Sequence, residues 1–341
     1  MSDLNKNKIL EVKNLCTSFF TDEGEVKAVD GVNFFIEKGK TVGIVGESGS
    51  GKSITSLSIL RLIQEPAGKI VNGEIVFKGE NLLEKSKKEM RSIRGNNISM
   101  IFQEPMTSLN PTMTCGEQIA ESIRIHQKLG RKEAKEKAIE MLKLVGIPSP
   151  EKRVKQYPFE LSGGMRQRVM IAIALACNPE LLIADEPTTA LDVTIQAQIL
   201  DLIRNLQKEL GTSLMIITHD LGVVAEMCET VAVMYCGKIV EYADVKTILT
   251  NPKHPYTIGL LNSVPRHDQV YDGDLPVIKG SVPSPFNLPK GCRFVSRCPH
   301  AKDICHNQLP ELKTMDDGNQ VRCWIHTESW EKQEEEVASN S

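Results

Sequence analysis

Hydrophobic and polar positions follow different rhythms in successive parts of the chain. The first 40 residues mix apolar and polar positions in short runs, such as 8–12 and 31–36, and carry turn residues at 22–24 and 38–39. Short alternating runs bounded by turn residues are typical of paired strands. The pattern therefore predicts an antiparallel sheet at the start of the chain.

Beyond this sheet, continuously apolar runs alternate with stretches of helical periodicity. Continuous apolar runs predict buried strands, whereas apolar residues spaced every three or four positions predict helices. Strands are expected at Thr41–Val45, 98–102, 181–184 and 214–217, and helices at 53–62, 116–146 and 194–210. This alternation favours an α/β fold around a mostly parallel sheet, with 116–146 as a helical insertion.

The texture changes after about Thr250, where prolines become frequent and long periodic segments vanish. A chain of 341 residues exceeds one typical domain. We therefore expect a large domain at 1–250 and a small, irregular C-terminal domain at 251–341. The charged end, 328–341, is expected to fray.

A glycine-rich loop follows the first apolar strand: Gly46-Glu47-Ser48-Gly49-Ser50-Gly51-Lys52-Ser53. This run matches the pattern G-x-x-x-x-G-K-[ST], whose backbone N–H groups turn inward around phosphate oxygens at the positive end of a helix dipole. Lys52 can reach the β- and γ-phosphates of a nucleotide, and Ser53 can ligate Mg²⁺. A glycine-rich turn without a ligand is the alternative, and the flanking strand and helix argue against it.

Two carboxylates, Asp185 and Glu186, end the predicted strand 181–184. A buried strand of a parallel sheet delivers the residues at its carboxyl end to the ligand edge. Asp185 suits Mg²⁺ through the hydration shell of the ion, and Glu186 suits a general base that polarises an attacking water. Acidic residues also follow strands as solvated turns, so the pair gains its weight from the phosphate loop.

The run Leu161-Ser162-Gly163-Gly164-Met165 resembles the signature of ABC-type ATPases, with Met where the commonest form has Gln. The resemblance implies a P-loop NTPase fold with a RecA-like parallel-sheet core, an antiparallel β subdomain and a helical subdomain at about 105–178. In this family the signature closes over the γ-phosphate held by a second ATPase subunit. One chain would thus hold half of each of two composite sites.

Other motifs of this family follow in the same order, over about residues 8–250. Gln103 resembles the Q-loop glutamine, which senses Mg²⁺ and the nucleophilic water in a region that contacts transmembrane subunits. Asp192 resembles the end of the D-loop, in the run Ala190-Leu191-Asp192, and His219 resembles the switch histidine that touches the γ-phosphate. The resemblance implies a catalytic set of Glu186, His219, Gln103 and Lys52.

Phe19 lies upstream, where this family stacks an aromatic ring on adenine. Its neighbour Phe20 is a rival, and either ring could belong to the core. The implied nucleotide contacts are Phe19, the loop residues Gly46 to Ser53, Ser162, Gly163, Gly164 and Asp192. The implied Mg²⁺ set is Ser53, Gln103 and Asp185.

The tail Asn251-Pro-Lys-His254-Pro255-Tyr256-Thr-Ile-Gly-Leu-Leu resembles the C-terminal extension of ATPases that serve dipeptide and oligopeptide importers. The runs 104–111 and 184–192 look like the same subgroup. Nickel importers are close relatives and stay open as an alternative. The resemblance implies an ATPase that works as a dimer, with a paralogous subunit or with itself. Its further partners are two transmembrane permease subunits and an extracytoplasmic peptide-binding protein.

Four cysteines gather in this tail with the spacing Cys292-x₅-Cys298-x₆-Cys305-x₁₇-Cys323. Clustered cysteines in a cytosolic chain suggest metal rather than disulfides. Zinc sites use tighter pairs, so these spacings favour a [4Fe–4S] cluster, as some members of the importer subgroup carry. Zinc, with His300 or His306 as alternative ligands, and buried thiols without metal both stay open.

Net charge and hydropathy indicate where in the cell the chain works and which classes of partner it does not bind. The net charge of −3 gives no sign of broad nucleic-acid binding, and no window approaches a membrane span of about 18 apolar residues. The polar start lacks the apolar core of a signal peptide. We therefore expect a cytoplasmic chain that serves a membrane from its surface. A non-transport ABC ATPase and a redox-responsive regulator are the rival functions.

Overall fold

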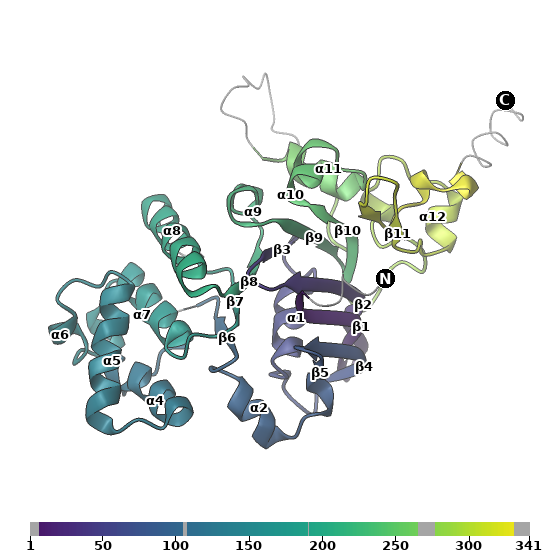
Figure 1. The fold of residues 1–341 in the computed structure, drawn as a ribbon. Helices are drawn as coiled ribbons and strands as arrows, with labels where there is room; N and C mark the ends of the chain where they lie inside the picture. The colour runs from purple at the N-terminus through teal and green to yellow at the C-terminus, as the bar shows by residue number, and fades with distance from the viewer. Residues whose placement is uncertain (1–6, 105–107, 190, 265–276, 331–341) are drawn as a thin grey trace, which may run out of the picture.

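The computed structural model describes residues 7–104, 108–189, 191–264 and 277–330. Within these ranges, a central sheet lies between a group of helices, a second sheet and a C-terminal extension (Figure 1). The arrangement is that of an α/β protein, as the alternation of strands and helices predicts.

The central sheet is parallel in its middle and antiparallel towards one edge. In spatial order its strands are β11 (Lys313–Thr314), β12 (Gln320–Val321), β10 (Lys238–Asp244), β9 (Thr230–Tyr235), β3 (Thr41–Val45), β8 (Ser213–Thr218), β7 (Leu181–Asp185) and β6 (Ile98–Ile101). From β9 to β6 all neighbours are parallel, whereas β10, β12 and β11 pair antiparallel. The strands expected at Thr41–Val45, 98–102, 181–184 and 214–217 are confirmed as β3, β6, β7 and β8.

Both faces of the central strands are covered, which explains their unbroken apolar sequences. In β7, Leu181 and Ile183 pack into one hydrophobic cluster, while Leu182 and Ala184 pack into the other. The first cluster also holds residues of the antiparallel sheet, and the second holds residues of the helical region. The parallel sheet is thus the layer that joins the rest of the fold and fixes its carboxyl edge.

The second sheet is antiparallel and comprises β2 (Gly24–Glu37), β1 (Lys8–Thr21), β4 (Gly68–Phe77) and β5 (Glu80–Asn81), in that order. The expected sheet in the first 40 residues is confirmed as the hairpin of β1 and β2, whose strands are longer than the short runs predicted. β4 adds to β1 from a later part of the chain, so its place depends on long-range pairing.

In the described part of the chain, the helices are, in order, α1 (Lys52–Ile59), α2 (Lys87–Ile93), α4 (Cys115–Gln127), α5 (Arg131–Leu144), α6 (Pro150–Arg153), α7 (Gly163–Leu175), α8 (Val193–Leu210), α9 (Leu221–Met227), α10 (Val245–Thr250), α11 (Pro255–Asn262) and α12 (Asp303–Asn307). The expected helical insertion at 116–146 corresponds to α4 and α5. α4 begins at a capping box, in which Thr114 and Glu117 each accept a backbone N–H of the other. Figure 1 shows α4 to α7 grouped at one side of the sheet, beyond β6.

The C-terminal extension joins the edge of the central sheet. β12 pairs with β10, and Tyr256 of α11 and Phe294 belong to the same buried cluster as the helical region. The change of sequence texture near Thr250 therefore marks a change from regular to irregular structure within a shared core. The boundary at residue 250 stays a prediction.

Candidate active site

The phosphate loop connects the end of β3 to the start of α1, as expected from the sequence. Gly46 and Gly51 have φ angles of 158° and 101°. A Cβ at Gly46 would lie 2.2 Å from the backbone oxygen of Met234, and one at Gly51 would lie 2.4 Å from that of Ala28. Only glycine fits at these positions, because neighbouring backbone passes so close to the loop.

The tip of the loop is open, but one of its hydroxyls is buried. Ser48 and Gly49 are exposed, whereas Ser50 is 2% exposed. The Ser50 N–H donates to the Glu47 carbonyl over 3.2 Å, and its Oγ has no hydrogen-bond partner among the described residues. A buried hydroxyl without a partner is costly, so this atom is suited to meet a polar ligand.

The Lys52 side chain folds into the loop. Its Nζ donates to the backbone oxygens of Gly46 and Glu47 over 2.7 and 3.0 Å. Burial lowers the pKa of the Lys52 amine, and the negative charges of Glu186 and Asp185 oppose that shift. The amine is therefore directed at the space that the loop encloses, where phosphate oxygens can replace the carbonyl contacts.

Asp185 ends β7 beside the first turn of α1. The Ser53 Oγ donates to Asp185 Oδ1 over 3.1 Å, and Asp185 is 4% exposed. Burial raises the pKa of Asp185 to about 6. A hydroxyl and a carboxylate are the hard oxygen donors that Mg²⁺ prefers, so these residues fit the ion.

The Glu186 carboxylate lies beside both Gln103 and His219. Its Oε2 accepts hydrogen bonds from Gln103 Nε2 over 3.2 Å and from Thr189 Oγ1 over 2.9 Å. The His219 Nδ1 lies 3.5 Å from the other oxygen, Oε1. Glu186 itself has a φ of 44°, a conformation that is uncommon for a residue with a side chain. The fold thus aims one carboxylate between the ends of β6, β7 and β8.

The aromatic pair expected near adenine lies at the end of β1. Phe19 is half-buried, and its ring would meet a Cβ placed on Gly68 at 2.9 Å. Phe20 is 46% exposed, and the Lys69 Nζ lies 5.9 Å from its ring centroid. Both rings therefore stay candidates for stacking on a base.

The signature residues lie at the start of α7. Ser162 caps the helix by accepting the Met165 N–H over 3.4 Å, and Ser162 and Gly163 are exposed. Asp192 caps α8 in the same way, by accepting the Ile195 N–H. Among the described residues, no hydrogen bond joins Ser162 or Asp192 to the phosphate loop. Ala190, which opens the expected D-loop, lies outside the described residues.

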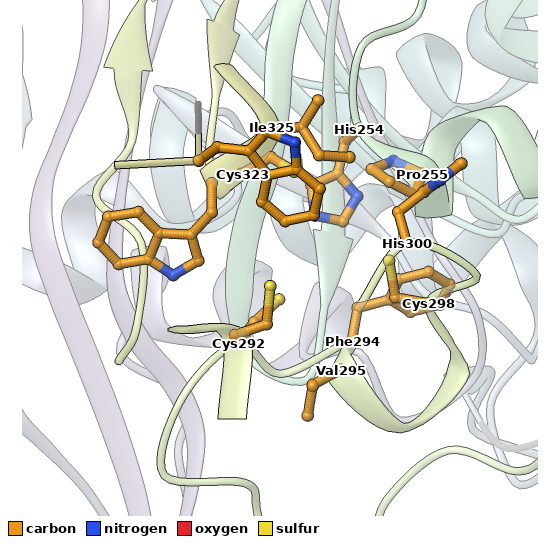
Figure 2. A pocket seen from close by; sticks show the side chains of 12 residues that line it. His254, Pro255, Cys292, Phe294, Val295, Cys298, His300, Cys323 and Ile325 are labelled. Carbon is orange, nitrogen blue, oxygen red and sulfur yellow. The ribbon is translucent and has the colours of Figure 1, made fainter. Parts of the chain in front are cut away.

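The four clustered cysteines line one pocket in the C-terminal extension. Figure 2 shows Cys292, Cys298 and Cys323 around this pocket, and Cys305 completes the lining. His254 and His300 also line it, together with largely apolar side chains. The Cys292 N–H donates to the Cys305 carbonyl over 2.8 Å, which ties the two segments together.

Two of these thiols, Cys292 and Cys323, are hard to ionise. Burial raises the pKa of Cys292 to about 11 and that of Cys323 to about 12, and the neighbouring cysteines add to both shifts. In the described part of the chain, no group of three or more His, Cys, Asp or Glu residues is placed to hold a metal ion. The structure therefore brings the expected cysteines together without the geometry of a single-ion site.

Comparison of the sequence with known proteins shows the family to which the chain belongs. The chain is 55% identical over 328 residues to the oligopeptide transport ATP-binding protein AppD of Bacillus subtilis, covering 95% of this chain and 99% of that protein. It is 55% identical over 320 residues to a probable peptide ABC transporter ATP-binding protein of Sinorhizobium fredii, covering 94% and 96%. The chain belongs to the ATP-binding proteins of peptide ABC transporters.

Family models and solved structures agree with this membership. The ABC transporter model matches residues 29–189, and the model of the oligopeptide/dipeptide transporter C-terminal region matches 240–305. A dimeric ATP-binding cassette in a post-hydrolysis state with ADP and Pi has a TM-score of 0.63 at 29% identity, covering 69% of this chain and 98% of that one. The predicted family and ABC-type ATPase fold are confirmed.

The ABC ATPase site holds one residue that the sequence did not single out. Thr189 donates to Glu186, yet its only local signal is its place in the Pro187-Thr188-Thr189 run.

Among the helices that the structure describes, none combines the length and the hydrophobicity that a membrane span needs.

Proposed function

We propose that this chain is the ATP-hydrolysing subunit of an importer for dipeptides and oligopeptides. The observation that carries the proposal is the carboxylate of Glu186, which accepts from Gln103 and Thr189 and faces His219. It lies next to Asp185, which binds Ser53 of the phosphate loop. A base placed beside a phosphate loop and a Mg²⁺ site is the arrangement that ATP hydrolysis requires.

Each group has a part in the reaction. The loop from Gly46 to Ser53 and the Lys52 amine hold the phosphates of ATP. Ser53, Asp185 and Gln103 would hold Mg²⁺, which would supply positive charge to offset the charge that develops on the phosphates. Glu186 polarises the attacking water, which Gln103 helps to orient. His219 contacts the γ-phosphate, so that catalysis rests on positioning and charge stabilisation.

The site is completed by a second ATPase subunit. Ser162, Gly163, Gly164 and Asp192 are exposed or half-buried and have no hydrogen bond to their own phosphate loop among the described residues. We assign them to the nucleotide of the partner subunit, either a paralogous ATPase or a second copy. The solved cassette with ADP and Pi is dimeric, which supports this assignment.

The remaining partners follow from the peptide importers to which the relatives belong. Two permease subunits carry the solute across the membrane. They contact the region of Gln103, and closure of the ATPase dimer drives them through this contact. An extracytoplasmic binding protein delivers the peptide. The chain then lies at the cytoplasmic face of the membrane, with 1–250 as its ATPase domain, about 105–178 as the helical subdomain and 251–341 as the extension.

The cysteine pocket is assigned to a [4Fe–4S] cluster. The support is the convergence on one pocket of Cys292, Cys298, Cys305 and Cys323. Burial raises the pKa of Cys292 and of Cys323, and a bound cation would favour the thiolate form of both. A cubane spreads its four thiolates more widely than a single ion does. This difference is compatible with the absence of a single-ion group in the described residues.

Anaerobic purification with assays for iron and acid-labile sulfide tests this assignment. We expect both elements in the full chain and their loss in Cys298→Ser, whereas Cys177→Ser, outside the pocket, keeps them. Zinc without iron would favour the zinc alternative with His300 or His306. A colourless chain without metal would overturn the assignment.

Uptake by cells that lack the native chain tests the transport function. Cells that express the chain are expected to accumulate labelled dipeptides or oligopeptides, and cells that express Glu186→Gln are expected to accumulate none. Restored uptake of labelled nickel without peptide would replace the peptide assignment by the nickel alternative. Failure to restore either, with normal expression, would contradict the importer function.

A further inference from the structure

The phosphate loop is held from outside by the C-terminal extension. The Glu47 N–H donates to the hydroxyl oxygen of Tyr256, in α11, over 2.8 Å. The Glu47 carboxylate accepts two hydrogen bonds from Arg297, of 2.6 Å from Nη1 and 3.1 Å from Nη2. Two residues that lie more than 200 positions away in sequence therefore bind the second residue of the loop.

Arg297 is a fixed anchor rather than a mobile surface cation. Its side chain is 4% exposed, and its Nε and Nη2 also donate to the carbonyls of Lys279 and Ile278 over 3.1 and 3.2 Å. The hydrogen bonds to Glu47 raise the pKa of Arg297. A bidentate pair with a buried guanidinium holds the carboxylate in one orientation and balances its charge, whereas an exposed ion pair does neither reliably.

Tyr256 is equally fixed. It is fully buried, and its ring packs against Tyr235 and Phe294 with centroid distances of 4.6 and 5.4 Å. Its backbone N–H donates to His254 Nδ1, which anchors the start of α11. The phenol oxygen is thus presented to the loop from a packed aromatic cluster.

The contact with Tyr256 fixes the plane of one peptide group. In the trans peptide between Gly46 and Glu47, the carbonyl and the N–H point in opposite directions. The N–H binds Tyr256, and the carbonyl accepts from Lys52 Nζ over 2.7 Å. Holding the N–H from outside therefore turns the carbonyl towards the amine inside the loop, which sets where Lys52 rests.

We infer that Tyr256 and Arg297 are positioning residues for the phosphate loop, and that the C-terminal extension thereby raises the affinity of the chain for ATP. The inference rests on the proposed function, in which this loop holds the phosphates. Neither residue approaches Glu186 or Asp185 through any hydrogen bond in the described residues. Their loss is therefore expected to weaken nucleotide binding more than the chemical step.

The experiment compares kcat and KM for ATP in the full chain and its variants. We expect Arg297→Met and Tyr256→Phe each to raise KM about tenfold, the effect of losing a hydrogen bond that orders a charged site, with kcat changed less than twofold. Arg297→Lys should recover part of the affinity. Direct titration with Mg·ATP should give a parallel rise in Kd.

Arg293→Met is the matched control. Arg293 also lies in the extension and pairs with a carboxylate of the ATPase domain, Asp30, over 3.0 Å, but it does not bind the phosphate loop. Its KM should stay within twofold of the native value. Tyr256→Phe removes one oxygen from a packed ring, so it keeps the test open if Arg297→Met does not fold.

The outcomes separate this inference from the proposed function. A native chain that neither binds nor hydrolyses ATP would remove the proposed function itself. A native chain that hydrolyses ATP, with unchanged KM in Tyr256→Phe and in the folded Arg297 variants, would overturn only the positioning role. A rise in KM of the same size in Arg293→Met would also overturn it, because the effect would then report general loosening of the extension.

Discussion

Replacing Asp185 by Asn is expected to make the nucleotide-free chain more stable while it removes Mg²⁺ binding. Asp185 is 4% exposed, and burial raises its pKa to about 6 from an ordinary value of 3.8. An ionised carboxylate at this place therefore destabilises the folded chain. Asn keeps an acceptor for the Ser53 hydroxyl and carries no charge.

The sign and size of the effect follow from the linkage between ionisation and folding. The pKa of Asp185 is higher in the folded chain than in the unfolded chain, so its ionisation destabilises the fold. This destabilisation is complete above about pH 6 and disappears as the pH falls towards 3.8, the pKa of the unfolded chain. A tenfold change in an acid dissociation constant corresponds to about 1.4 kcal/mol. The difference between 3.8 and about 6 therefore destabilises the folded chain by about 3 kcal/mol at neutral pH. For a chain of this length, that corresponds to about 5 °C in Tm.

Thermal unfolding of the native chain, Asp185→Asn and the exposed control Asp22→Asn provides the assay. Without nucleotide, Asp185→Asn should unfold at the higher temperature near pH 7.5, and its advantage should shrink near pH 5. Adding Mg²⁺ and ATP should stabilise the native chain and the control but hardly change Asp185→Asn. If Asp185→Asn unfolds at or below the native temperature at both pH values, burial does not have the assigned cost.

Three further substitutions test other parts of the site. Changing Ser162 to Arg on both chains of a dimer should leave ATP binding intact and reduce hydrolysis at least tenfold, and full activity would refute the shared site. Gly46→Ala should lower Tm by several degrees because its Cβ would lie 2.2 Å from a backbone oxygen. Gly49→Ala, with nothing within 4 Å, should cost only about 1 kcal/mol of backbone strain and lower Tm by about 1–2 °C. Phe19→Ala should weaken ATP binding about tenfold without changing pyrophosphate binding, and the same loss in Phe20→Ala alone would move the stacking role to Phe20.

Local patterns predicted the parts of the fold that are built from local signals. The run Thr41–Val45 is buried on both faces, so its unbroken apolar sequence identified β3 at its observed bounds. The helical region was predicted because α4 and α5 have apolar residues at helical spacing. Asp185 and Glu186 were identified because the end of a parallel strand fixes where its next residues lie.

Contacts between distant segments had no such signal. β11 and β12 are two residues each, too short for a periodic pattern, and they form because β10 offers an edge. The pairing of Arg297 with Glu47 joins positions 250 residues apart, and neither belongs to a motif that names the other. The sequence therefore carried no signal that the irregular tail packs onto the phosphate loop.

In the proposed function, Glu186 activates the water that hydrolyses ATP bound at the phosphate loop. The most direct test is the rate of phosphate release by Glu186→Gln at saturating Mg·ATP, beside Glu180→Gln, a carboxylate that pairs with Lys78 instead. We predict unchanged ATP binding, an ATP-dependent dimer and a turnover at least 100-fold below the native rate for Glu186→Gln, with native turnover for Glu180→Gln. Native turnover in Glu186→Gln would rule out Glu186 as the base that activates water.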